Sequence, residues 1–246
     1  MYFILIVKMQ QERMKLFDDE IFSHKKNFDY DYFIQNLSEV TKDMNKLKCF
    51  EFLVMIWELT KIFNQLGTSL SMAFSDITEK VNIIRNLLKN EFPEVVDFQS
   101  MIEQEIKLNI QELNGENNKD LGHKKGTLYY TYISGTRTVL RLLWFLDFMV
   151  SICNLLYITN DSFSTCCKKA YDTALGIHHP WYVRSAASMA MSFVSSSREP
   201  VANIVLNREK WDDESVRKIK IMHSNLEIVQ KYVRDYYNEK GLQNLP

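Results

Sequence analysis

The sequence has few of the residues that interrupt helices. Among 246 residues there are only 7 Gly and 4 Pro, and stretches such as 68–92 and 136–175 contain neither. Because Gly and Pro mark most tight turns between strands, their scarcity argues against a sheet-rich fold and favours long helices. Hydrophobic residues make up 46% of the chain and charged residues 25%, which is an ordinary globular composition.

An excess of one charge is also absent, and so is a cysteine framework. The chain has 30 Lys and Arg against 31 Asp and Glu, whereas general nucleic-acid binders carry a basic excess. The four cysteines lack zinc-ligand spacing, and Cys166 and Cys167 are neighbours, a poor basis for a disulfide framework. We therefore expect no nucleic-acid partner, no metal or other cofactor, and a reduced cytoplasmic setting.

Two apolar stretches bear on membrane targeting. Met1–Val7 has no basic region and no small-residue cleavage site, so we do not expect a signal peptide. The most apolar stretch, 139–158, is interrupted by Arg141, Asp147 and Asn154, whereas a membrane span needs about 20 apolar residues without such charges. We expect this stretch to be a buried central helix.

Apolar residues recur at mixed spacings of three and four along most of the chain, as in amphipathic helices. Gly67 and Pro93 separate neighbouring segments, Pro180 suits the first position of a helix, and Asp212 or Asp213 can cap the last one. The pattern predicts an all-α protein of eight or nine helices. These cover residues 27–41, 45–65, 69–90, 94–113, 136–157, 164–177, 180–195, 199–208 and 212–239.

The first group of candidate site residues is on the segment 69–90. Asp76 and Lys80 are four residues apart and so project from one face of a helix, beside apolar Ile77 and Val81. On its own this pattern is more typical of a surface ion pair next to a core stripe.

The second group is at the start of the apolar helix. Arg137 and Arg141 are one turn apart, and nearly every residue after Arg141 is apolar. A guanidinium in such surroundings is unfavourable unless an anion accompanies it. Two interpretations stay open: Arg141 pairs with an internal carboxylate, Asp76 or Asp147, or the two arginines and Lys80 clamp a phosphate, for which the guanidinium fork is well suited.

The third group is His178-His179-Pro180-Trp181. A histidine just before a helix-starting proline can present its ring beside the helix N-terminus, although a capping or core histidine is the commoner case. A metal site built from the two histidines and the adjacent cysteine pair is disfavoured, because neighbouring residues rarely point at one ion.

In this order, the three groups resemble the glycolipid transfer protein superfamily, in the branch that transfers ceramide 1-phosphate. The resemblance covers about residues 45–246 and includes the Leu66–Thr68 turn and, more weakly, the Leu242–Pro246 ending. It implies an N-terminal helical segment, 1–44, and a lipid-transfer domain, 45–246. The implied fold is a two-layer sandwich of about eight helices around an apolar lipid pocket.

The resemblance also implies roles for individual residues. Asp76 accepts hydrogen bonds from the ceramide amide N–H and the sphingoid hydroxyl, and His179 donates to the amide carbonyl. Trp181 helps to dock the protein at a membrane interface, where indole rings are favoured. The phosphate is held by three cations: Lys80, Arg137 and Arg141.

The residue at position 141 distinguishes the glycolipid-binding branch of the family from the phosphate-binding branch. In the glycolipid-binding branch a Trp platform for a sugar ring stands there, and cations bind phosphate better than a neutral sugar. Two features depart from the family: the predicted loop 114–135 is longer and includes Lys124 and Lys125 as a possible additional entrance cation, and Trp144 stands where the family is often basic.

We therefore expect non-enzymatic transfer of a phosphorylated sphingolipid such as ceramide 1-phosphate by a cytoplasmic protein that docks transiently on membranes. Burial of each lipid methylene contributes about 0.8 kcal/mol, so two long chains supply ample affinity. No nucleophile–base pair or Gly-rich phosphate loop is evident, so we expect no enzymatic activity. The alternatives are glycosylceramide transfer, a lipid sensor with little transfer activity, and a ligand-free helical scaffold.

Overall fold

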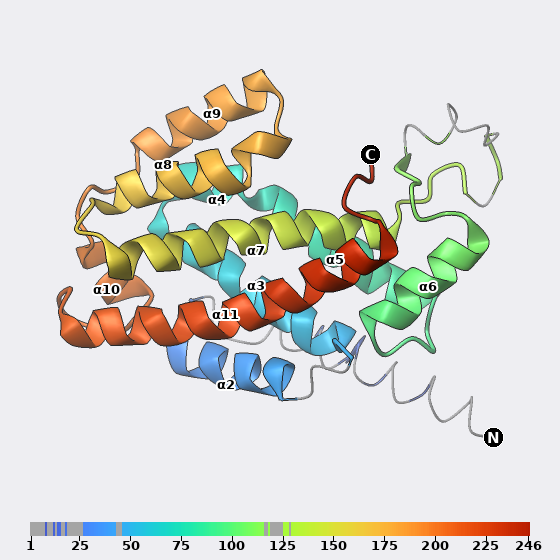
Figure 1. Ribbon diagram of the computed structural model, residues 1–246, viewed down its shortest axis with the longest axis horizontal. Helices are drawn as coiled ribbons and strands as arrows, with labels where there is room; N and C mark the ends of the chain where they lie inside the picture. Colours follow the sequence, from blue (N-terminus) through green and yellow to red (C-terminus); the bar gives the residue numbers. More distant parts are fainter. Residues whose placement is uncertain are drawn as a thin grey trace.

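The computed structural model describes residues 27–42, 46–115 and 129–246, together with Lys8, Glu12, Met14, Lys15, Asp18, Asn118 and 125–127. In these residues all regular structure is helical, which confirms the all-α class (Figure 1). The helices are α2 (Tyr30–Thr41), α3 (Cys49–Leu66), α4 (Thr68–Ala73), α5 (Ser75–Asn90), α6 (Phe98–Leu108), α7 (Gly135–Ile158), α8 (Phe163–Ala174), the 3₁₀ turn η2 (Gly176–His178), α9 (Trp181–Ser192), α10 (Glu199–Ile204) and α11 (Asp213–Lys240).

The centre of the fold is α7, which packs against α11, α8, α5 and α6. In Figure 1, α7, α8 and α11 form a front layer over α3, α4 and α5, which is the expected two-layer arrangement. Helix α2 packs against α3 and α11 and so belongs to the same helical body. The division into a segment 1–44 and a domain 45–246 stays a prediction.

Helix α7 is the buried central helix that the apolar stretch predicts. Within the described part of the chain, it alone is long and apolar enough to cross a membrane, with a mean hydropathy of 1.8. In that window 67% of the residues are buried by neighbouring helices, so its apolar side chains are used in packing. All four cysteines are buried and free.

The prediction of one helix over 69–90 is wrong, because the chain breaks at Phe74. Phe74 leaves the helical conformation with φ −107° and ψ 8°, and separates α4 from α5. Its buried ring stacks on Phe63 and Phe148, with centroid distances of 4.1 and 5.2 Å. Core packing of this ring overrides the local helical preference, and α5 consequently begins one residue before Asp76.

Other helix ends differ by a few residues from the predicted ones. Helix α6 is shorter than 94–113, because Asp97 caps its start by accepting a bond from the Ser100 N–H and Asn109 ends it with a positive φ of 57°. Pro180 is the residue before α9 rather than its first residue. The predicted cap Asp212 is confirmed, since its carboxylate accepts a hydrogen bond from the Ser215 N–H at 2.9 Å.

The start of α7 is held by one buried carboxylate. Glu105 of α6 is fully buried and accepts hydrogen bonds from the N–H groups of Gly135 and Thr136, at 2.6 and 2.8 Å. It also accepts bonds from the hydroxyls of Tyr132, Ser134 and Thr136. A carboxylate satisfies the unpaired N–H groups at a helix N-terminus and is stabilised by the helix dipole there. Part of the loop 114–135 thereby packs on the body through Tyr132, whereas Lys124 lies outside the described residues.

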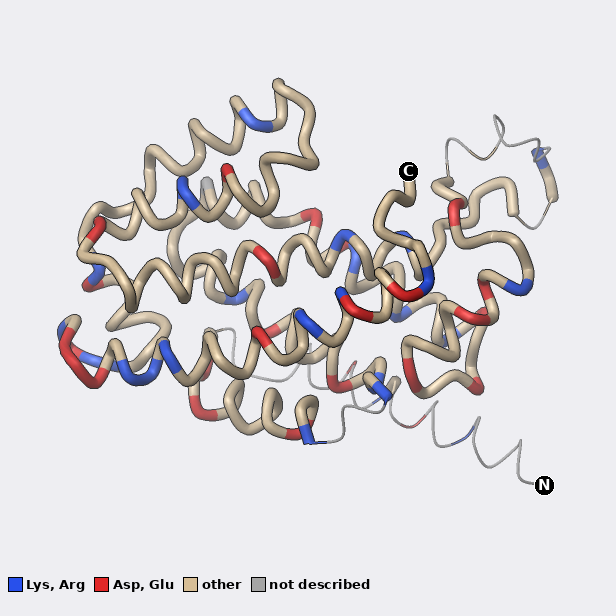
Figure 2. The backbone as a smooth tube through the Cα atoms, in the orientation of Figure 1, with Lys and Arg blue, Asp and Glu red and all other residues tan. Residues whose placement is uncertain are grey.

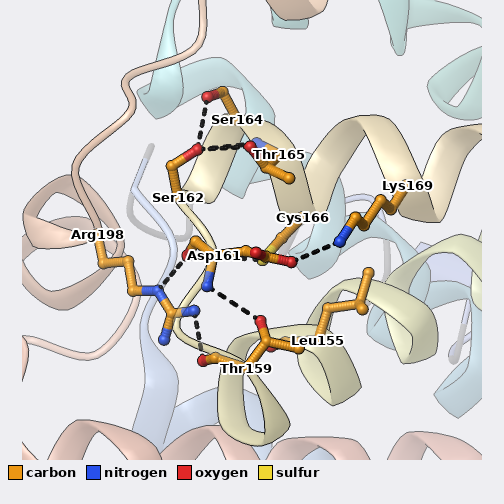
Figure 3. A network of polar contacts seen from close by, with 9 residues as sticks. All are labelled: Leu155, Thr159, Asp161, Ser162, Ser164, Thr165, Cys166, Lys169 and Arg198. Carbon is orange, nitrogen blue, oxygen red and sulfur yellow. Dashed lines mark hydrogen bonds and ion pairs between the residues drawn. The ribbon is translucent and has the colours of Figure 1, made fainter.

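The end of α7 is held by an arginine from the segment before α10. Arg198 donates to the main-chain oxygens of Leu156, Thr159 and Asp161 at 2.7–2.9 Å. Figure 3 shows its side chain facing Thr159 and Asp161. The three carbonyls lie at or just beyond the C-terminus of the helix, where a cation is favoured. Both ends of the central helix are therefore fixed by charged side chains from other elements.

Candidate ligand-binding cavity

A cavity of about 800 Å³ lies between α4, α5, α7, α8 and α9. Five predicted site residues line it: Asp76, Lys80, Arg137, Arg141 and His179. The other walls are largely apolar and include Phe74, Leu175, Ala187 and Met191. The volume lies within the usual range of roughly 300–1,000 Å³ for small-molecule sites. The fold thus brings the three sequence groups to one place, while their individual roles stay predictions.

Asp76 and Lys80 form the predicted ion pair on α5. The Lys80 side chain is only 18% exposed and that of Asp76 is 61% exposed, so the pair stands at the cavity mouth with its cation turned inward. Because of the break at Phe74, Asp76 lies in the first turn of α5, where the helix dipole stabilises a carboxylate.

The two arginines are half-buried and donate to main-chain oxygens of the last two residues. Arg141 Nη2 donates to the oxygens of Leu245 and Pro246 at 3.2 and 2.6 Å, and Arg137 Nε donates to the oxygen of Pro246. The Nη1 atom of Arg141 is buried and has no hydrogen-bond partner. Burial, with a smaller contribution from Arg137, lowers the pKa of Arg141 to about 10, so both arginines are charged at neutral pH.

The hypothesis that Arg141 pairs with an internal carboxylate is wrong. Asp76 is paired with Lys80, and Asp147 accepts from Arg234 and, at 2.7 Å, from Gln230 Nε2. The acceptors of Arg141 are instead the main-chain oxygens of Leu245 and Pro246.

Trp144 stands between Arg141 and His178. The Arg141 guanidinium carbon lies 4.0 Å from the indole centroid, and the His178 ring stacks on the indole at 3.6 Å with an interplanar angle of 2°. Two groups this close to one ring cannot share a face, so they cover opposite faces of the indole. A cation over an indole face is favourable, and the stack holds Arg141 at the cavity wall.

His179 is oriented by Tyr171. The buried Tyr171 hydroxyl lies 2.9 Å from His179 Nδ1, and both residues line the cavity. Burial raises the pKa of Tyr171 and lowers the pKa of His179, so a protonated phenol faces a neutral imidazole at neutral pH. If the phenol donates to Nδ1, the ring proton is on Nε2, where it is available to a ligand carbonyl.

The outer surface of α9 and the adjacent α4 is apolar and exposed. Trp181, Tyr182, Met189 and Phe193 are 60–73% exposed, and Met72 of α4 is 75% exposed. Trp181 is thus on this surface and not in the cavity wall. Helix α9 carries a single charged residue, Arg184, and Figure 2 shows this helix almost entirely in the colour of uncharged residues. Contiguous exposed apolar side chains of this size mark interaction surfaces.

Sequence reasoning missed two features that shape the site. Glu105 fixes the helix start that presents the arginines, but a single Glu in an amphipathic helix carries no local sign of burial. The Trp144–His178 stack joins residues 34 positions apart in sequence, and no spacing rule pairs them. Among described residues there is no group of three or more His, Cys, Asp or Glu side chains that could hold a metal ion.

Comparison with known proteins gives the family. The sequence profile described as Glycolipid transfer protein (GLTP) matches residues 47–205. The "Ceramide-1-phosphate transfer protein" of Danio rerio is 32% identical over 152 residues, which span 59% of this chain and 65% of the relative. The Xenopus laevis protein of the same name is 27% identical over 208 residues, 83% of this chain and 90% of the relative.

The fold has solved counterparts. The crystal structure of mouse ceramide-1-phosphate transfer protein in its apo form has a TM-score of 0.75, at 21% identity over 89% of this chain and 100% of that chain. The human protein in complex with 12:0 ceramide-1-phosphate has the same TM-score, at 20% identity and the same coverage. The helical fold is therefore the GLTP fold, and the chain belongs to the glycolipid transfer protein family.

Proposed function

We propose that this protein is a non-enzymatic carrier that moves a phosphorylated sphingolipid, ceramide 1-phosphate or a close analogue, between membranes. The observation that carries the proposal is that Lys80, Arg137 and Arg141 line one largely apolar cavity, with the Arg141 Nη1 donor unpaired. Related proteins that carry this ligand in their names support the choice.

The phosphate would replace the carbonyl acceptors of the arginines. Arg137 and Arg141 converge on the Pro246 oxygen, so one oxygen position is already shared by two guanidinium groups. A phosphate brings negative charge and several oxygens to the same donors, and guanidinium groups can bind phosphate through two parallel hydrogen bonds. Ligand entry would therefore exchange a single shared oxygen for several phosphate oxygens.

The ceramide amide would lie between Asp76 and His179. Asp76 accepts from the amide N–H and the sphingoid hydroxyl, and His179 Nε2 donates to the amide carbonyl. An amide in an apolar cavity needs partners for both of its polar groups, and these two side chains line the same cavity.

A sugar headgroup is less well served. A sugar needs an accessible aromatic face, but both faces of the one indole in the cavity wall, Trp144, are covered by Arg141 and His178. The indole faces on which a sugar ring could stack are thus covered by the Arg141 guanidinium and the His178 ring. This arrangement favours a phosphate over a sugar.

Membrane contact would be made by the apolar surface of Trp181, Tyr182, Met189, Phe193 and Met72, on a cytoplasmic protein that docks only transiently. This surface borders the cavity, since Met72, Met189 and Phe193 belong to both. The apolar surface and the cavity lining therefore share residues, which gives the lipid chains an apolar path from the bilayer into the cavity. The variant Trp181→Ala should slow transfer without weakening lipid binding, because Trp181 lies outside the cavity lining.

The test is transfer of fluorescent ceramide 1-phosphate between vesicles by the wild-type protein and by Arg141→Leu. Loss of one charge-assisted interaction of about 1.5–3 kcal/mol predicts a fall of roughly 10- to 100-fold. Arg217→Leu is the matched control, because Arg217 is an exposed arginine paired with Glu214 on α11. Undiminished transfer by Arg141→Leu would refute the phosphate clamp.

Two further readouts separate the alternatives. Native mass spectrometry of the purified protein should show a bound phosphoceramide, and a bound glycosylceramide would transfer the assignment to the other branch. Lipid recovered after many transfer cycles should be chemically unchanged, and release of phosphate would identify an enzyme instead. Strong binding without transfer would identify a lipid sensor.

A further inference from the structure

A second cavity of about 470 Å³ lies beside the first, between α7, α8, η2, α11 and the chain after α11. Trp144 and His178 line both cavities, so their stacked rings form a shared wall. We call this second cavity the polar groove, because many of its lining side chains are amides or hydroxyls. These are Ser151, Thr173, Gln230, Asn238, Gln243 and Asn244.

The charges of the polar groove cancel. Its one carboxylate, Asp147, accepts from Arg234 and from Gln230 Nε2, and its side chain is 14% exposed. Burial lowers the pKa of His178, so this histidine is neutral at pH 7. The groove thus offers no unbalanced charge to an anion or a cation, and the indole of Trp144 has no free face for a cation.

A neutral, hydroxyl-rich group suits this lining. Each amide supplies donors and an acceptor, which is the combination that hydroxyl groups need. Gln243 Nε2 donates to Asn238 Oδ1 at 2.6 Å in an exposed pair, so these amides can exchange their mutual bond for bonds to a ligand. The volume of 470 Å³ is within the range of small-molecule sites.

We propose that the polar groove is a second headgroup subsite, which receives a polyol esterified to the ligand phosphate. The protein then takes sphingolipid phosphodiesters with a polyol, in addition to the monoester. This rests on the proposed function, because the phosphate must be held by Lys80, Arg137 and Arg141. A diester keeps one negative charge and two non-bridging oxygens for the cations, while its second ester bond leads past the Trp144–His178 wall into the groove.

The experiment is competition against transfer of fluorescent ceramide 1-phosphate. The competitors are unlabelled ceramide 1-phosphate, ceramide phosphoinositol and ceramide phosphoethanolamine with identical chains. For the wild type we expect the inositol diester to compete within tenfold of the monoester and better than the ethanolamine diester.

Two variants address the groove alone. Thr173→Trp fills it from an exposed position of α8, and Asn238→Leu removes one amide of α11. The inositol diester should weaken at least tenfold in the first and several-fold in the second, while monoester competition changes less than twofold and so reports correct folding. The matched controls are Ser224→Trp and Asn225→Leu, since both residues are on α11 but outside the groove.

The outcomes are distinct. If the monoester competes and the inositol diester does not, the proposed function stands and the subsite is refuted. The subsite is also refuted if the variants leave the inositol diester unaffected, if they weaken both lipids equally, or if the ethanolamine diester competes better. If no phosphoceramide competes, the proposed function fails and the subsite with it.

Discussion

The two ends of α7 place arginines in different situations. At the end of the helix, Arg198 makes hydrogen bonds with three main-chain carbonyls and its guanidinium carbon lies 5.1 Å from the Trp211 ring. At the start, Arg141 donates to the main-chain oxygens of Leu245 and Pro246, shares the second of these with Arg137, and keeps one buried donor unpaired. Both groups donate to backbone oxygens, but only the group at the start lines a cavity.

This difference separates an arginine that holds main-chain carbonyls of the fold from the two arginines that we propose bind a ligand. A buried donor without a partner is unfavourable by about 1–3 kcal/mol, so it persists where another requirement retains it. Satisfaction of hydrogen bonds is therefore more informative here than burial, because Arg137, Arg141 and Arg198 are all partly buried. The predictions below test the contrast from the largest expected effect on stability to the smallest.

The carboxylate that holds the start of α7 should matter most for stability. In Glu105→Gln the amide can no longer accept all five hydrogen bonds, and its NH₂ group faces main-chain donors. We expect the free energy of unfolding to fall by about 3 kcal/mol, from two lost bonds to a charged acceptor. Urea denaturation followed by circular dichroism measures this, with exposed Glu112→Gln as the control, expected within about 0.5 kcal/mol of wild type. A change below 1 kcal/mol would contradict the role of Glu105.

Removing Arg198, at the end of α7, should destabilise the protein but leave ligand binding unchanged. Arg198→Leu leaves the carbonyls of Leu156, Thr159 and Asp161 without their donor, so we expect a loss of about 2–3 kcal/mol. Arg217→Leu, which breaks an exposed ion pair, should lower stability by less than about 1 kcal/mol. In the folded fraction, ceramide 1-phosphate binding should be unchanged, and a parallel loss of binding would break the contrast.

Replacing Arg141, at the start of α7, by leucine should weaken ligand binding but leave the stability of the fold intact. Arg141→Leu removes a buried, incompletely paired charge that lies near Arg137, so the free energy of unfolding should stay constant or rise by up to about 1 kcal/mol. Ligand affinity falls as described for the transfer assay. Urea denaturation without lipid decides the point, and a loss above 2 kcal/mol would show that Arg141 stabilises the fold like Arg198.

The smallest effect should be a dependence of stability on mild acid. Burial lowers the pKa values of His178 and His179 below the usual 6.5. The unfolded chain then binds protons that the folded chain does not, so stability is full above about pH 6.5 and declines as the pH falls below it. His179→Gln should reduce the slope of unfolding free energy against pH between 7 and 5. An unchanged slope would mean that His179 protonates freely in the folded protein.

Local sequence patterns were enough to predict the fold class, several helices and which side chains share a helix face. The all-α class, the buried helix over 139–158 and the cap Asp212 follow from spacing and from side-chain chemistry. The two pairs at a spacing of four, Asp76 with Lys80 and Arg137 with Arg141, could also be assigned to one helix face each, because that spacing is fixed by the helix itself. The family resemblance then supplied the expectation that the groups meet.

Other features depend on packing. The break at Phe74 follows from aromatic contacts with Phe63 and Phe148, which are 11 and 74 residues away in sequence. The partners of Arg141 are carbonyls more than 100 residues away. No periodicity or motif encodes contacts of this kind.

By itself, the sequence determined the helices and the residue types that each helix presents, because hydrogen bonding and apolar spacing act over a few residues. The tertiary structure decided which of those side chains find partners. It paired Asp147 with Arg234, placed Trp144 between Arg141 and His178, and left one buried donor of Arg141 without a partner. The physical reason is that burial and pairing are set by neighbours brought together in space.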